Sequence, residues 1–335
     1  MVHWSNQRHV KVSDDTAGNT WAPEAYYDDE ISKYVVYWAS NLYESADQSA
    51  RTSLTYNRMM YATTDDFINF SKPHVWIDVD RRGQAGAGSI DATVQKVGDT
   101  YYRVYKDEKS MTLRQEKPTD LLASVNGQYP SFGGVSTENQ WSLVGERIGD
   151  KQPNGYGGTF TAGEGPTMFK ANKNDVNGYQ YYLFADQPNY HGGPNHYVPM
   201  ATKNITDASS WEVIGEKMPE ANFPTNSDGG KPRHGTIIPV TREQYQKVLE
   251  AYAPSVAVTR VPRVSVQVSV GADIVAALPS AVAIMTKDKK THKVAVQWNV
   301  PAGVSSKVRT VEVTGTIQDD SRMPITARVK VRKGK

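Results

Sequence analysis

The sequence contains no cysteine among its 335 residues. This absence excludes disulfide bonds, thiolate metal sites and a cysteine nucleophile. The sequence also lacks an apolar run long enough to cross a bilayer, so we expect no membrane span. The residues that follow Met1 are polar rather than hydrophobic, and no signal peptide is visible there.

Aromatic residues are nearly absent from the C-terminal part of the chain. Every Tyr and every Phe lies before residue 253, and only Trp298 follows. Charge changes at the same place, since residues 255–335 hold fourteen Lys or Arg against five Asp or Glu. Such a shift indicates a domain boundary. We predict one domain over residues 1–253 and a second over residues 255–335.

The basic C-terminal part alternates Lys and Arg with Val and Thr, as over residues 327–332. This alternation is typical of a strand with one solvent-exposed face. No aromatic stacking platform is interleaved with the charges. We therefore predict no nucleic-acid partner.

Helical patterns are scarce in the first 250 residues, which predict short strands separated by Gly, Asn, Asp and Pro turns. The exception is a helix predicted at residues 241–249, which opens with the Thr-x-x-Gln pattern of a capping box.

Two series of residues recur at intervals of about seventy. Aromatic residues that we interpret as strand ends are spaced by 66, 71 and 70 residues, at Trp4, Phe70, Trp141 and Trp211. A polar series is spaced by 67, 73 and 70 residues, at Glu24, Asp91, Glu164 and His234. Interlocked series of one period indicate repeated supersecondary units. Each unit has room for about four strands, which is a propeller blade.

A propeller brings the first strand of each blade to its central axis, so the polar series is expected to converge on one pocket. Tyr-rich apolar strands are expected next, at residues 34–38, 101–105 and 181–184. The position one period before Glu24 would precede Met1. We therefore expect an incomplete first blade whose axial residue is missing.

Glycoside hydrolysis generally requires one protonated carboxyl group and one ionised carboxylate. Glu164 lies between two glycines, which permit close approach of a substrate, and it suits the acid role. Asp91 is its expected axial neighbour, which would keep Glu164 protonated and oriented. The structural alternatives are a turn Glu and an Asp that caps a strand end. Glu24 and Trp21 either shape the pocket or only pack.

Three further positions are candidates for binding. His234 either binds a metal ion, for which calcium is a candidate, or fixes a water molecule. Arg233 is suited to contact a carboxylate or a sugar hydroxyl. Tyr197 closes a Gly-, His- and Tyr-rich segment over residues 186–197, whose composition suits a pocket rim or an ordinary surface loop.

Taken together, these segments resemble glycoside hydrolase family 43 over roughly residues 1–250. The motifs that carry the resemblance are Trp21-Ala22-Pro23-Glu24, Ser89-Ile90-Asp91, Gly163-Glu164-Gly165-Pro166-Thr167, Tyr181-Tyr182-Leu183-Phe184 and Arg233-His234-Gly235. The resemblance implies a five-bladed β-propeller that hydrolyses arabinose- and xylose-containing polysaccharides with inversion.

The resemblance also implies residue roles. Glu164 matches the family's general acid, and Asp91 matches the Asp that modulates the pKa of that acid. His234 matches a central His that contributes to a calcium or water site in some members. No residue of this chain matches the general base, an Asp at the start of the first blade, so we expect impaired hydrolysis.

Residues 255–335 resemble a bacterial immunoglobulin-like domain, and the likeness is carried by residues 277–282, 294–298 and 325–329. It implies a small β-sandwich that acts as a spacer or accessory module. The expected fold is therefore all-β, a five-bladed β-propeller with an incomplete first blade followed by an immunoglobulin-like β-sandwich.

These observations predict an α-L-arabinofuranosidase or β-xylosidase type of hydrolase, extracellular or on the cell surface and monomeric. The alternative from another class is a non-catalytic propeller that binds glycans. A third possibility is a sucrose-cleaving propeller, although the sequence lacks the Arg-Asp-Pro and Glu-Cys motifs of that class.

Overall fold

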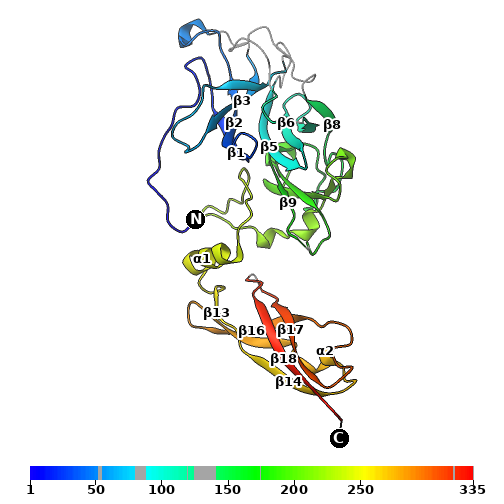
Figure 1. Cartoon of the computed structure of the whole chain (residues 1–335). Helices are drawn as coiled ribbons and strands as arrows, with labels where there is room; N and C mark the ends of the chain where they lie inside the picture. Colours follow the sequence, from blue (N-terminus) through cyan, green and yellow to red (C-terminus); the bar gives the residue numbers. More distant parts are fainter. Residues whose placement is uncertain are drawn as a thin grey trace. The chain divides into compact units, whose positions relative to one another are not determined.

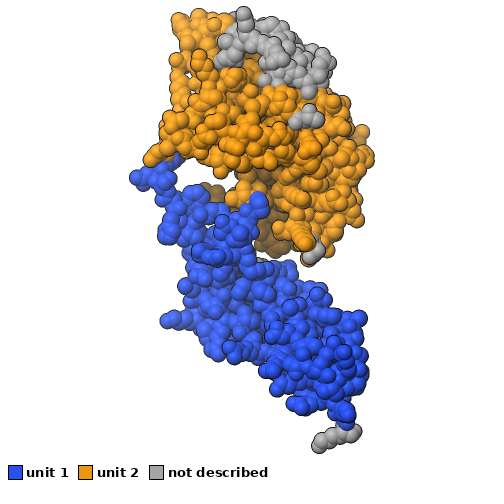
Figure 2. Space-filling view, viewed as in Figure 1, with its two compact units in different colours: residues 1–7, 239–335 blue, residues 8–238 orange. Residues whose placement is uncertain are grey.

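The computed structural model describes residues 1–51, 55–79, 88–118, 120–123, 141–173, 175–319 and 321–334 (Figure 1). The chain divides into two compact units, one formed by residues 8–238 and the other by residues 1–7 with residues 239–335 (Figure 2). Each unit contains hydrophobic cores of its own. The boundary between the two units, at residues 238 and 239, lies before the helix at residues 242–252. The predicted domain limits of residues 1–253 and 255–335 remain predictions.

Residues 8–238 form three four-stranded antiparallel sheets, each with its strands in sequence order. The first contains β1 (Trp21–Asp28), β2 (Lys33–Asn41), β3 (Asn57–Thr64) and β4 (His74–Ile77). The second contains β5 (Ser89–Val97), β6 (Thr100–Asp107), β7 (Thr112–Lys117) and β8 (Ser142–Glu146). The third contains β9 (Glu164–Lys170), β10 (Tyr181–Gln187), β11 (His196–Thr202) and β12 (Glu212–Val213).

Each sheet has the form of a propeller blade, and the all-β prediction is confirmed. The remaining elements of this unit are short 3₁₀ turns, η1 (Gln48–Ala50), η2 (Asn189–His191), η3 (Ala208–Ser210), η4 (Gly215–Lys217) and η5 (Glu220–Asn222). The count of five blades stays a prediction.

The polar series falls on the first strands of the three sheets. Glu24, Asp91 and Glu164 lie on β1, β5 and β9, and β5 contacts both of the other strands. The Tyr-rich segments form the second strands, β2, β6 and β10, as predicted. His234 differs, because it lies in an irregular segment rather than on a strand.

The aromatic series does not end strands, and that interpretation was wrong. Trp141 and Trp211 directly precede β8 and β12, and both rings are buried. The Trp211 indole Nε1 donates to Gln115 Oε1 on β7 at 2.8 Å, so the ring anchors one sheet to the previous sheet. Trp4 lies in no strand and is 78% exposed. At Trp141 and Trp211 the period therefore reflects packing between sheets rather than strand ends.

The second unit begins with the predicted helix, α1 (Arg242–Tyr252). Thr241 and Gln244 form the capping box, which is confirmed. The elements that follow are β13 (Val258–Arg260), β14 (Val264–Ser269), α2 (Ile274–Ala277), β15 (Ala281–Thr286), β16 (Thr291–Asn299), β17 (Arg309–Ile317) and β18 (Pro324–Arg332).

These strands follow the order β13-β15-β16-β17-β18-β14, with only the β14–β18 pair parallel. Residues 291–295 of β16 pair with β15, and residues 296–299 pair with β17, so β16 links two halves of the sheet. On β18, Val329 and Val331 are buried whereas Arg328 and Arg332 are exposed. The predicted strand with one solvent-exposed face is confirmed. No helix among the described residues has the length and apolarity that crossing a membrane requires.

Candidate functional site

Glu164 opens β9, and both of its carboxylate oxygens are engaged. Oε2 accepts a hydrogen bond from Lys106 Nζ at 2.6 Å. Oε1 accepts from the Tyr190 hydroxyl and from Arg233 Nη2, the latter at 3.0 Å. Glu164 and Lys106 are both buried. The predicted acid therefore lies at the centre of a cluster of donors.

Asp186 is a second carboxylate of this cluster, and sequence reasoning missed it. It lies on β10, where it pairs directly with Glu164 across the sheet, and it is fully buried. Asp186 Oδ2 accepts from Arg233 Nε at 2.7 Å, so the Arg233 guanidinium bridges the two carboxylates.

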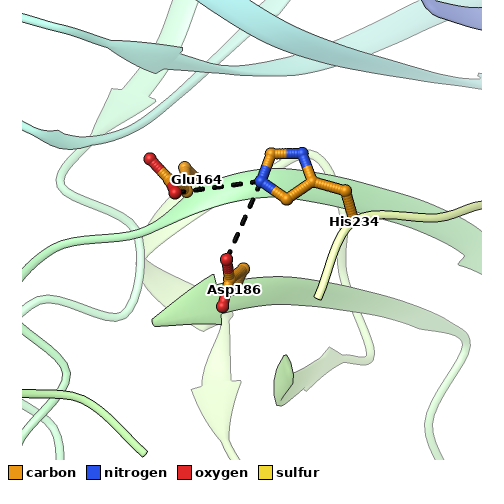
Figure 3. Close-up of side chains that lie close together, drawn as sticks. All are labelled: Glu164, Asp186 and His234. Atoms are coloured by element: carbon orange, nitrogen blue, oxygen red, sulfur yellow. Dashed lines mark ion pairs between the residues drawn. The ribbon is translucent and has the colours of Figure 1, made fainter. Parts of the chain in front are cut away.

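His234 completes the cluster. Its Nε2 lies 3.8 Å from Glu164 Oε1 and 3.7 Å from Asp186 Oδ2. Figure 3 shows the ring reaching from its extended segment toward both carboxylates. The backbone at Gly165 makes room for this ring, because a Cβ there would lie 2.8 Å from His234 atoms. Gly165 also has a positive φ of 52°, which glycine adopts without strain.

Asp91 is tied to the same strand. Its Oδ2 accepts a hydrogen bond from the Gly165 backbone N–H at 2.9 Å. Asp91 is buried and has a φ of 56°, a backbone conformation that costs free energy for a residue other than glycine. The predicted neighbours Asp91 and Glu164 are thus brought together, through the backbone of Gly165 rather than by a bond between their carboxyl groups.

Glu24 belongs to a separate hydrogen-bonded chain across the three first strands. Its Oε1 accepts from the Tyr37 hydroxyl at 3.0 Å and from Thr93 Oγ1 at 2.9 Å. Thr93 Oγ1 in turn accepts from the Met168 backbone N–H at 3.0 Å. These hydrogen bonds therefore link the neighbouring strands β1, β5 and β9, as the sequence repeat predicts.

The carboxyl groups have opposite electrostatic environments. Burial raises the pKa of Glu24 to about 8, against hydrogen bonds from Thr93 and Tyr37. Burial also raises the pKa of Asp91. Burial acts in the same direction on Glu164, but the neighbouring His234 and hydrogen bonds from Lys106 and Tyr190 outweigh it and hold the pKa of Glu164 well below the ordinary value.

The sequence led us to expect a protonated Glu164, whereas the groups around it favour its ionised form. The physical reason is the set of basic groups around it, Lys106, Arg233 and His234. The neighbouring Glu164 carboxylate in turn raises the pKa of His234. These contacts therefore favour an ionised Glu164 carboxylate.

The other predicted binding residues occupy different positions. Trp21 begins β1 and is 53% exposed. Tyr197 is buried, and its hydroxyl donates to the Gly235 carbonyl at 3.0 Å. Roles for these two side chains in sugar binding remain predictions.

The carboxylates of Glu164 and Asp186 and the imidazole of His234 lie close enough to hold an ion, with ligand atoms within 4.8 Å of one another. Calcium takes six to eight oxygen ligands. Here the Lys106 and Arg233 cations already pair with the carboxylates, and one of the three ligands is a nitrogen. These residues do not fit calcium, and we derive no step through a metal ion.

Three residues of the site were missed by sequence reasoning, Lys106, Asp186 and Tyr190. Lys106 and Asp186 lie on second strands, and strand register brings them opposite Ile90 and Glu164. The seventy-residue period identifies only the first strand of each sheet. The pairing register between first and second strands would have identified Lys106 and Asp186. Tyr190 lies in the segment that was considered as a pocket rim.

Comparison with known proteins gives two family matches. Residues 1–246 match a family related to glycoside hydrolase family 43 and described as a probable glycosyl hydrolase domain. Residues 261–320 match the bacterial Ig-like domain, group 4. The chain is also 31% identical over 202 residues to an alpha-L-arabinofuranosidase of Bifidobacterium longum subsp. longum. That match spans 52% of this chain and 16% of the length of the relative.

Solved structures show distant likenesses. A thermostable family-43 glycoside hydrolase has 13% identity and a TM-score of 0.40, with 91% of this chain and 76% of that chain covered. A family-43 beta-1,3-galactosidase has 12% identity and a TM-score of 0.38, with 94% and 77% covered. An exo-beta-1,3-galactanase of Phanerochaete chrysosporium has 14% identity and a TM-score of 0.32, with 59% and 35% covered.

Proposed function

The chain belongs to the family related to glycoside hydrolase family 43 and described as a probable glycosyl hydrolase domain, and on this premise we propose that it hydrolyses α-L-arabinofuranosidic bonds. The observation that carries the proposal is the placement of Glu24, Asp91 and Glu164 on three adjacent first strands, with Asp91 bonded to the Gly165 backbone beside Glu164. The likeness of 202 residues to an alpha-L-arabinofuranosidase supports arabinose over other sugars.

We assign Glu164 the role of proton donor to the leaving oxygen. The side chain is 10% exposed, and three side chains donate hydrogen bonds to it. Since these contacts keep Glu164 ionised, donation requires that an entering sugar displace one of the donors to Glu164 Oε1. Asp91, whose charge opposes ionisation of Glu164, then favours its protonated form. Inversion at the anomeric carbon is the expected stereochemical outcome, and because no residue is assigned to activate the attacking water molecule, we expect slow hydrolysis.

The ionised state of Glu164 also favours a second candidate function, a pocket that binds a sugar without cleaving it. A carboxylate is a strong acceptor for sugar hydroxyls, and Lys106, Arg233 and Tyr190 are strong donors. A binding pocket needs no proton donor, so the low pKa of Glu164 presents no obstacle to this role.

A panel of substrates separates these functions. The full chain is incubated with α-1,5-arabino-oligosaccharides, xylo-oligosaccharides and β-1,3-galacto-oligosaccharides, and the released sugars are quantified by chromatography. We expect arabinose release in excess of xylose and galactose release. Binding of arabino-oligosaccharides by calorimetry without any release establishes the binding pocket instead. Release of xylose or galactose alone contradicts the proposed substrate.

A further inference from the structure

We propose that Tyr190 caps the catalytic carboxylate in the free protein and forms the subsite for the leaving-group sugar, against which its ring packs when the cap opens. This inference rests on the proposed function and adds to it the side of the pocket from which the substrate chain enters.

The contact on Glu164 Oε2 is closed to a substrate. Its donor, Lys106, has a side chain that is only 5% exposed, and it lies on the second strand of its sheet. A buried ion pair of this kind is costly to break, because each charge would lose its partner without regaining water. The glycosidic oxygen must therefore reach Glu164 through Oε1.

The contacts on Oε1 come from side chains that are more exposed than Lys106. Arg233 is partly exposed, but its guanidinium is also held by the fully buried Asp186. Tyr190 differs, because it is 63% exposed and its hydroxyl bonds to Glu164 at the inner end of the ring. Tyr190 and Arg233 both donate to Oε1, and of these two side chains Tyr190 is thus the less restrained.

The backbone beneath Tyr190 is fixed, so the cap opens by rotation of one side chain. Tyr190 lies in η2, where the N–H of His191 donates to the Pro188 carbonyl and that of Gly192 to Asn189. Gly193 also donates to the Pro188 carbonyl, and a Cβ on Gly193 would collide with the Gln187 backbone. A rigid turn that presents an exposed ring needs no loop rearrangement to admit a ligand.

The chemistry of this position suits a sugar. A tyrosine ring offers an apolar face and a polar edge, which match the apolar C–H face and the hydroxyl groups of a pyranose or furanose. The His191 ring lies beside it, with centroids 4.6 Å apart, and extends the aromatic wall. A sugar that displaces the hydroxyl from Oε1 places its glycosidic oxygen at Glu164 and its next ring at Tyr190.

Two substitutions at Tyr190 distinguish the role of its hydroxyl, which caps Glu164, from the role of its ring, which packs against the sugar. Tyr190→Phe removes the hydroxyl that competes for Glu164 and keeps the ring, whereas Tyr190→Ala removes both. Dissociation constants are measured by calorimetry with the full chain, for arabinose and for arabinotriose. Phe67→Ala serves as the control, since Phe67 is an exposed ring of the same unit on the β3–β4 connection.

We expect Tyr190→Ala to weaken arabinotriose binding by about three- to tenfold and to leave arabinose binding nearly unchanged. Tyr190→Phe and Phe67→Ala are expected to bind arabinotriose at least as tightly as the unsubstituted chain. An equal loss in Tyr190→Phe and Tyr190→Ala overturns the inference, because the hydroxyl rather than the ring would then bind the sugar. So does an unchanged constant in Tyr190→Ala.

Different results would refute the subsite and the proposed function. Hydrolysis that depends on Glu164 together with an unaffected Tyr190→Ala refutes the subsite and leaves the proposed function intact. An unsubstituted chain that binds neither arabinotriose nor its xylose and galactose counterparts overturns the proposed function, and this inference with it.

Discussion

The oxygens of Glu24 and Glu164 show how one residue type acquires two charge states. Glu24 accepts hydrogen bonds from two neutral hydroxyl groups, and burial dominates its pKa. Glu164 is surrounded by cations and stays ionised. The sequence predicted that both side chains lie near the propeller axis, but their charge states depend on side chains such as Lys106, whose position is set by register rather than by spacing.

Glu24 leads to a prediction about stability and pH. Its pKa is raised from 4.5 to about 8 in the folded chain, so the unfolded chain releases this proton at lower pH than the folded chain does. The contribution of Glu24 to the free energy of unfolding is therefore fully present below pH 4.5 and is lost as pH rises toward 8. Glu24→Gln should remove this fall, and its stability relative to the unsubstituted chain should rise by about 4 kcal/mol between pH 4.5 and pH 9.

Urea unfolding at a series of pH values measures this effect. Glu216→Gln, which changes an exposed Glu of the same unit, is the control and should run parallel to the unsubstituted chain. Parallel curves for Glu24→Gln would show that Glu24 is ionised in the folded chain near neutral pH.

At the level of elements, the repeat in the sequence predicted the central strands well and their partners poorly. First and second strands of three sheets lie where the polar series and the Tyr-rich segments placed them. The aromatic series was misassigned because a buried Trp between blades leaves the same spacing as a Trp at a strand end. Trp141 illustrates this, since it packs edge to face on Trp76 of the first sheet, with ring centroids 5.6 Å apart.

The same junction holds a buried ion pair that the sequence did not suggest. Arg103 on β6 is fully buried, packs 3.5 Å from the Trp141 ring centroid and pairs with Glu116 on β7. Glu116 also accepts hydrogen bonds from Tyr105 and Arg114. Because a buried charge without its partner is strongly destabilising, Glu116→Gln should lower the free energy of unfolding by about 3–5 kcal/mol.

Chemical denaturation tests this prediction, with Glu146→Gln as the matched control. Glu146 pairs with Arg114 on the same sheet, but its side chain is 54% exposed, so its loss should cost at most about 1 kcal/mol. In the double variant Arg103→Met with Glu116→Gln, much of the lost stability should return. Equal effects of the two Glu variants would mean that burial does not govern the strength of these pairs.

At the level of the whole molecule, composition separated two parts of different chemistry. The aromatic-rich residues form the three sheets, and the basic, Val-rich residues form a six-stranded arrangement with its own cores. The family matches follow the same division, at residues 1–246 and 261–320. Composition could not predict the cluster of charged side chains around Glu164, because its members are spread from Lys106 to His234 and only folding brings them together.

The central claim is that Glu164 donates a proton to the leaving oxygen of an arabinofuranoside. The direct measurement compares kcat/KM of the unsubstituted chain and of Glu164→Gln on two substrates, 4-nitrophenyl α-L-arabinofuranoside and arabinotriose. The aryl leaving group needs little protonation, whereas the sugar leaving group needs it fully. We predict a loss of about 100-fold or more on arabinotriose and a much smaller loss on the aryl substrate. Equal losses on both substrates, or no loss on arabinotriose, would contradict the account.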